Sequence, residues 1–116
     1  MKFVIDLEPL PQARARFGNG KCYEPSRLRE YKNTLKWLVK SAGAEILTGA
    51  VEVSIKLYRK FKATSRRFGD FDNLAKAICD SLNGVCYVDD SQIVKCTVEK
   101  IQSATAKIEV EIMQAD

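Results

Sequence analysis

The stretch 51–58 constrains the fold of this chain more than any other, because its residues alternate strictly between apolar and other side chains. Val51, Val53, Ile55 and Leu57 occupy every second position of this stretch. Successive side chains of a β-strand point to opposite faces, so the alternation predicts a strand with one buried face. We therefore expect the chain to build a sheet around this strand.

Other segments predict further strands. Residues 3–7, 94–98 and 108–112 carry apolar side chains at alternate positions, and a turn at 102–105 joins the last two of these strands. A short apolar run at 85–88 predicts one more strand. Residues 13–24 predict a hairpin, because Asn-Gly pairs such as Asn19-Gly20 tolerate the positive φ of tight turns. Such a hairpin would hold its arginines out on an arm.

Two helices are expected between these strands. The first begins near Ser26 as its N-cap and stops at Gly43, and the second runs from about Asn73 to Leu82. Trp37 lies opposite the apolar stripe of the first helix, so we expect it to cover either a second core face or a partner subunit. The apolar stripes consist of Leu28, Tyr31, Leu35, Leu38 and Ala42 in the first helix, and of Leu74, Ile78 and Leu82 in the second.

The sum is a single α/β (α+β) domain over residues 1–116, with a mixed β-sheet and two helices. A length of 116 residues fits one domain. No apolar run is long enough to span a bilayer, and the first residues lack the features of a signal peptide. We expect a cytoplasmic protein that has no membrane partner. Without a C-x-x-C pair the four cysteines predict buried thiols and neither zinc nor disulfides.

The chain contains no histidine, which excludes Ser-His and Cys-His nucleophile systems. Catalysis would have to use carboxylates, lysine, tyrosine or a metal ion. The net charge of +4 is mild and by itself does not indicate nucleic acid. The distribution of charge is more informative, because the last of three basic groups contains no acid and is followed at once by acids. The groups are Arg14, Arg16 and Lys21; Arg27, Arg29, Lys32, Lys36 and Lys40; and Arg59, Lys60, Lys62, Arg66 and Arg67.

Carboxylates follow this last basic group at a spacing that suits a metal ion. Asp70 and Asp72 would point to the same face if their segment is extended. A return of the chain through the second helix and the short strand could bring Asp90 beside them. Mg²⁺ prefers oxygen ligands and keeps several waters, so two or three carboxylates suffice. Spacing alone leaves another interpretation open, in which Asp72 is only an N-cap and Asp90 belongs to a polar turn.

Residues 70–84 and 88–93 carry a more specific pattern. They read DFDNLAKAICDSLNG and VDDSQI. They resemble the signature of RusA-like Holliday junction resolvases, D-x-D-N-x-x-K-x-x-x-D-x-L, a glycine-containing turn and D-D-x-Q-[VI], at every defined position. Pro9 and Pro11 with the following arginines, and a helix bearing Arg29 and Tyr31, are also similar to this family. The resemblance covers nearly the whole chain.

The resemblance implies a crossover junction endodeoxyribonuclease that acts in DNA recombination and repair. Family members are homodimers that use Mg²⁺, for which Mn²⁺ can substitute, and resolve four-way DNA junctions by paired nicks. Asp70, Asp72 and Asp90 match the essential metal-binding aspartates, and Lys76 matches a catalytic lysine. The acids matched by Asp80 and Asp89 have no assigned role, although Asp80 could orient Lys76.

One position departs from the family pattern. Gly69 stands where some members carry an arginine, so Arg66 or Arg67 is expected to reach the phosphate instead. We expect DNA contacts from Arg14, Arg16, Lys60, Lys62, Arg66 and Arg67.

Two other functions remain open at this point. A non-catalytic nucleic-acid-binding module of the same fold would bind DNA without cleaving it. An interaction or structural protein with an Asp-rich turn would do neither.

Overall fold

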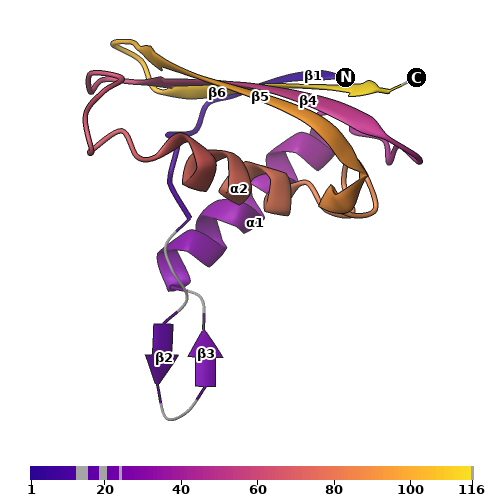
Figure 1. Ribbon diagram of the computed structural model, residues 1–116, viewed down its shortest axis with the longest axis horizontal. Coiled ribbons are helices and arrows are strands. Elements are labelled where there is room, and N and C mark those ends of the chain that lie inside the picture. The colour runs from indigo at the N-terminus through magenta and orange to yellow at the C-terminus, as the bar shows by residue number, and fades with distance from the viewer. Residues whose placement is uncertain (13–15, 19–20, 24, 116) are drawn as a thin grey trace.

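A computed structural model of the chain shows a four-stranded sheet with two helices packed on one of its faces (Figure 1). It describes the backbone of residues 1–12, 16–18, 21–23 and 25–115, and the side chains of residues 1–12 and 25–115. The elements in chain order are β1 (Lys2–Ile5), β2 (Arg16–Gly18), β3 (Lys21–Tyr23), α1 (Ser26–Ser41), β4 (Val51–Arg59), α2 (Phe71–Ser81), the 3₁₀ helix η1 (Asp90–Gln92), β5 (Ile93–Gln102) and β6 (Lys107–Gln114).

The strand order is β1-β6-β4-β5, which confirms the predicted mixed sheet. β4 and β5 are parallel, while β6 runs antiparallel to both β4 and β1. The parallel pair follows from the connection through α2, because parallel neighbours need a crossover of this length. The turn after β5 does not join neighbouring strands, since β4 lies between β5 and β6.

The core lies between the sheet and the two helices. The predicted alternation of β4 is confirmed, because Val51, Val53, Ile55 and Leu57 are all 2% exposed or less. Their partners on β6 alternate in the same register, with Ile55 opposite Val110. Both helices lie on this face, so the opposite face of the sheet is uncovered in a single chain (Figure 1).

Helix α1 differs from the prediction at its start and along its buried face. Pro25 occupies the cap position and no side chain caps the helix, so Ser26 is its first residue and not its N-cap. The buried stripe continues through Val39, whereas Ala42 is exposed. Gly43 follows the helix with a φ of +93°, as expected for a helix stop. Trp37 is 66% exposed.

The predicted strand at 85–88 is wrong. Residues 84–86 form a tight turn after α2, in which the N–H groups of Val85 and Cys86 both donate to the Leu82 carbonyl at 3.0 Å. Tyr87 makes isolated bridges to residues 47 and 83. Val85, Cys86 and Tyr87 are buried while Val88 is exposed, and a buried turn has the same composition as a short buried strand.

The predicted hairpin at 13–24 is confirmed for the part of it that the structure describes. β2 and β3 pair antiparallel, with Arg16 opposite Tyr23 and Gly18 opposite Lys21. The predicted turn pair, Asn19-Gly20, lies outside the described residues. The hairpin projects away from the sheet and the helices (Figure 1).

We predict that Tyr87→Phe lowers the free energy of unfolding by about 1 kcal/mol, the net contribution of one buried hydrogen bond. The fully buried Tyr87 hydroxyl donates to the Cys79 carbonyl at 2.7 Å and thereby ties the turn to the end of α2. Urea denaturation measures the change. An unaltered midpoint and slope would show that this bond does not hold the turn.

Candidate active site around helix α2

The N-terminus of α2 carries two of the predicted metal ligands. Asp70 is the N-cap residue, with extended backbone, and its carboxylate makes no cap hydrogen bond. Asp72 lies in the first helical turn. The helix therefore begins two residues earlier than predicted, and the argument that extended backbone puts both side chains on one face is wrong. Both carboxylates are exposed, at the end of the helix where the backbone dipole favours negative charge.

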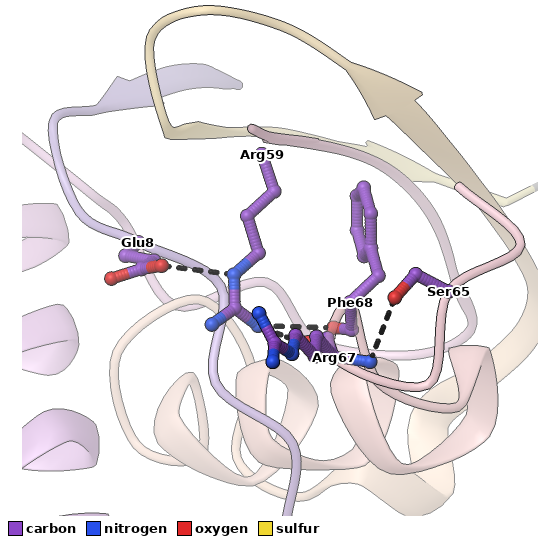
Figure 2. Close-up of polar contacts among 5 residues, drawn as sticks. All are labelled: Glu8, Arg59, Ser65, Arg67 and Phe68. Carbon is purple, nitrogen blue, oxygen red and sulfur yellow. Dashed lines mark hydrogen bonds and ion pairs between the residues drawn. The ribbon is translucent and has the colours of Figure 1, made fainter. Parts of the chain in front are cut away.

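The loop that leads into α2 is held by Arg59, the last residue of β4. Its Nη1 donates to the carbonyls of Arg67 and Phe68 at 2.7 and 3.2 Å, and its Nε pairs with Glu8 at 2.9 Å (Figure 2). Phe68 is fully buried beneath this contact. Arg59 therefore fixes the loop, whereas Arg67 lies with its guanidinium 5.6 Å from the centre of the Phe61 ring.

Gly69 is required by the backbone at this point. Its φ is +104°, and a Cβ there would lie 3.3 Å from two side-chain atoms of Pro11 and 3.4 Å from Leu74. An arginine at this position would meet both the strained backbone and the crowding. The departure from the family pattern at Gly69 thus has a local structural reason. The Gly69 carbonyl accepts a hydrogen bond from Lys100 Nζ at 3.0 Å.

The second half of the site is the D-D-x-Q segment, in which Asp89, Asp90 and Gln92 make different contacts. The Asp89 side chain accepts from the Ser91 N–H at 3.0 Å, and hydrogen bonds from the hydroxyl and N–H of Ser91 lower the pKa of Asp89. Gln92 Oε1 accepts from the N–H groups of Val88 and Asp89 at 2.8 and 3.0 Å. Asp89 and Gln92 together form a capping box.

Gln92 also anchors the segment to the rest of the fold. Its Nε2 donates to the carbonyls of Leu47 and Gly49 at 3.0 and 2.8 Å, just before β4 begins. With Asp89 and Gln92 both engaged in holding the turn, Asp90 is the carboxylate of this segment that meets Asp80. This division gives a structural reason to distinguish Asp90 from Asp89.

Asp90 meets Asp80 at the C-terminal part of α2. Desolvation, a side-chain hydrogen bond with Asp80 and the charge of Asp89 raise the pKa of the Asp90 carboxyl. Asp80 also pairs with Lys32 of α1, with Nζ and Oδ2 3.5 Å apart. Among the ion pairs of the described residues, Asp80 pairs with Lys32 and not with Lys76, so the orientation of Lys76 by Asp80 stays a prediction. Lys76 is exposed on the same helix.

The structure thus brings Asp90 together with Asp80, while Asp70 and Asp72 lie at the opposite end of α2. Within residues 1–12 and 25–115, no three acidic or cysteine side chains are gathered closely enough to hold a metal ion as they stand. The metal set of Asp70, Asp72 and Asp90 therefore stays a prediction.

The residues predicted to contact DNA fall into two places. Lys60, Lys62, Arg66 and Arg67 are exposed on the loop between β4 and α2. Arg16 lies on β2 of the projecting hairpin, and Arg14 lies outside the described residues.

Sequence reasoning missed two supporting residues, Arg59 and Lys100. Arg59 stood within the basic group, where nothing separates a structural arginine from an exposed one. For Lys100 a signal existed, because it continues the alternate positions of Cys96 and Val98 and so falls on the inner face of β5. A lysine there needs a polar partner, which the Gly69 carbonyl supplies.

Comparison with known proteins places the chain in a family. A family model described as endodeoxyribonuclease RusA matches residues 6–113. The uncharacterized protein YqaN of Bacillus subtilis (strain 168) is 31% identical over 136 aligned positions, which cover 98% of this chain and 96% of that protein. No helix in the described part of the chain is both long and apolar enough to cross a bilayer.

We predict that Gly69→Ala destabilises the protein more than Gly43→Ala does. Both residues have positive φ, but a Cβ at Gly43 would meet nothing within 4 Å. Gly43→Ala should cost about 1 kcal/mol for the backbone alone, and Gly69→Ala should cost more, because Pro11 and Leu74 must also move. Urea denaturation of both variants gives the comparison. Equal losses would contradict the crowding at Gly69.

We expect Gln92→Ala to lower the free energy of unfolding by about 1–3 kcal/mol, because it removes four hydrogen bonds, two within the turn at Val88 and Asp89 and two to the chain just before β4. Gln102→Ala, the same change at an exposed position of β5, is the control and should have an effect below about 0.5 kcal/mol. Thermal and urea melts compare the two. A Gln92 variant as stable as the control would remove Gln92 as the anchor.

Proposed function

Because the chain belongs to the RusA endodeoxyribonuclease family, we propose that it resolves four-way DNA junctions as a homodimer that requires Mg²⁺. The observation that carries the proposal is the family match over residues 6–113. Two identical sites related by a two-fold axis suit a substrate with two-fold symmetry, and paired nicks then follow from one site on each subunit. The biological setting implied is DNA recombination and repair.

Asp70, Asp72 and Asp90 are the proposed Mg²⁺ ligands. Their oxygen donors fit this ion in kind, because Mg²⁺ needs few carboxylates and keeps several waters. Mn²⁺ can take the place of Mg²⁺. Desolvation and the neighbouring Asp80 and Asp89 raise the pKa of Asp90, and a bound cation would relieve the crowding of these negative charges. When bound, the ion supplies activation of water and polarisation of the scissile phosphate.

The protein groups have separate roles in this proposal. Lys76, exposed on α2 one turn after Asp72, neutralises charge that develops on the phosphate in the transition state. Lys32 offsets part of the charge of Asp80 and so weakens the repulsion that Asp80 exerts on Asp90 and on the DNA. Asp89 and Gln92 hold the turn that presents Asp90. These assignments separate Asp90, which touches the reacting groups, from Asp89, which positions it.

DNA phosphates are proposed to contact the exposed loop after β4 and the projecting hairpin. Arg66 or Arg67 takes the place of the arginine absent at Gly69. Arg67 is partly engaged by the Phe61 ring, so Arg66 has the greater freedom to reach a phosphate. Phosphate contacts of this kind give affinity that depends on salt and follows the structure of the DNA more than its sequence. The full set is Arg14, Arg16, Lys60, Lys62, Arg66 and Arg67.

We predict that Asp90→Asn and Asp89→Asn have different effects, because Asp90 is a proposed metal ligand and Asp89 caps η1. Asparagine caps helices about as well as aspartate, so Asp89→Asn should keep cleavage within about threefold of the wild type. Asp90→Asn removes a proposed ligand and should lower the cleavage rate by about 100-fold or more, beyond the 10–100-fold cost of losing an outer-shell partner. The assay is Mg²⁺-dependent nicking of a labelled synthetic four-way junction.

A thermal melt of the same variants provides the control for metal binding. Mg²⁺ should raise the midpoint of the wild type and of Asp89→Asn, and should do so far less for Asp90→Asn. Junction binding without metal should persist in both variants. Equal cleavage by the two variants would contradict the assignment of Asp90, and binding with no cleavage by the wild type would favour the non-catalytic module.

A further inference from the structure

Strand β5 turns some of its side chains toward α2. In the parallel pairing with β4, Cys96 lies opposite Val53 and Lys100 lies opposite Leu57. Both partners on β4 are buried on the face that the helices cover. Neighbours in register share a face, so Cys96 and Lys100 also point to the helix side. Since β5 is the edge strand, the helices cover this side only in part, and Cys96 is exposed.

Helix α2 runs alongside β5 in the opposite direction. Lys100 Nζ donates to the Gly69 carbonyl at 3.0 Å, which fixes the start of α2 against this part of β5. From Gly69 the chain enters α2 at Phe71 and reaches Cys79 eight helical residues later, a rise of about 12 Å. From Lys100 back to Cys96 it covers four residues, or about 13 Å in a strand. These similar spans bring Cys79 opposite Cys96, close enough for each thiol to shift the pKa of the other.

The two thiols differ in accessibility and in acidity. Cys79 is buried, with 8% exposure, whereas Cys96 is exposed at the sheet edge. The hydrogen bond from Cys79 lowers the pKa of Cys96 to about 7, and the same bond, together with burial, raises the pKa of Cys79. An exposed thiolate next to a second thiol is the arrangement of a site that oxidises reversibly.

We propose that Cys96 and Cys79 form a peroxide-sensitive dithiol, in which exposed Cys96 reacts first and buried Cys79 resolves it into a disulfide that links β5 to α2. The proposal goes beyond the nuclease function and does not depend on it. Cys86 is fully buried, so no oxidant reaches it in the folded protein. The dithiol borders the candidate site, because Cys79 directly precedes Asp80.

The oxidant in this reaction is a hydroperoxide, and the disulfide forms in two steps. In the first step the Cys96 thiolate attacks one oxygen of hydrogen peroxide, the S–O bond forms and the O–O bond breaks. Hydroxide leaves and takes up a proton as water, and Cys96 is now a sulfenic acid. In the second step Cys79 Sγ attacks Cys96 Sγ, the S–S bond forms, the S–O bond breaks and the Cys79 proton leaves in a second water.

The test treats the reduced full-length protein with hydrogen peroxide at pH 7, blocks the remaining thiols under denaturing conditions and maps the peptides by mass spectrometry. We expect a peptide pair joined through Cys79 and Cys96 that dithiothreitol separates. Oxidation of Cys96 to sulfinic acid with Cys79 still free to be alkylated would overturn the proposal. So would a disulfide that joins any other pair.

Two variants make the result specific. Cys79→Ala removes the resolving thiol, so Cys96 should overoxidise, and its alkylation by iodoacetamide at pH 7 should slow by roughly tenfold as its pKa returns toward that of a free thiol. Cys86→Ala keeps both partners and should form the disulfide as the wild type does. An alkylation rate of Cys96 that is unaffected by Cys79→Ala would contradict the pairing. Neither readout requires nuclease activity, so failure here leaves the proposed function intact.

Discussion

Burial of one face of β4 is the constraint on which the rest of the structure depends. This strand has a hydrogen-bonded neighbour on each side and places four apolar side chains, all nearly inaccessible to water, beneath the two helices. Because its register is fixed on both sides, the positions of β5 and β6 relative to α1 and α2 are fixed as well. The two ends of β4 then become reference points: Arg59 holds the loop into α2, and Gln92 ties η1 to the chain just before β4.

The candidate site is assembled from polar contacts made at these reference points. Lys100 and Arg59 hold the start of α2 through backbone carbonyls, and Gln92 holds the turn that carries Asp90. None of these three side chains has to touch substrate. Their role is to fix the backbone from which the carboxylate side chains extend. Catalysis by metal-bound carboxylates depends on this, because the ligands must be well positioned. Asp80 and Asp90 repel each other, and Lys32 offsets this repulsion in part. A bound cation would relieve the rest.

Much of the fold could be predicted from the sequence, because β4, β6 and α1 each show the periodicity of an element with one buried face. The parallel order of β4 and β5 was not predicted, although the helix between them is the crossover that parallel strands need. The supposed strand at 85–88 failed because a buried turn is as apolar as a buried strand. For the site, the motif pointed to α2 and η1 as the segments of interest. It could not show that Asp70 is the N-cap, that Asp80 pairs with Lys32, or that Cys79 faces Cys96, since each depends on packing between distant segments.

The central claim is that this chain is a metal-dependent nuclease selective for four-way junctions. The most direct measurement incubates the wild-type protein with a labelled four-way junction, or with linear duplex of the same sequence, in Mg²⁺ and in EDTA. The account predicts paired nicks in opposed strands of the junction with Mg²⁺ only, and an intact duplex under both conditions. An uncut junction, or cleavage that persists in EDTA, would contradict it.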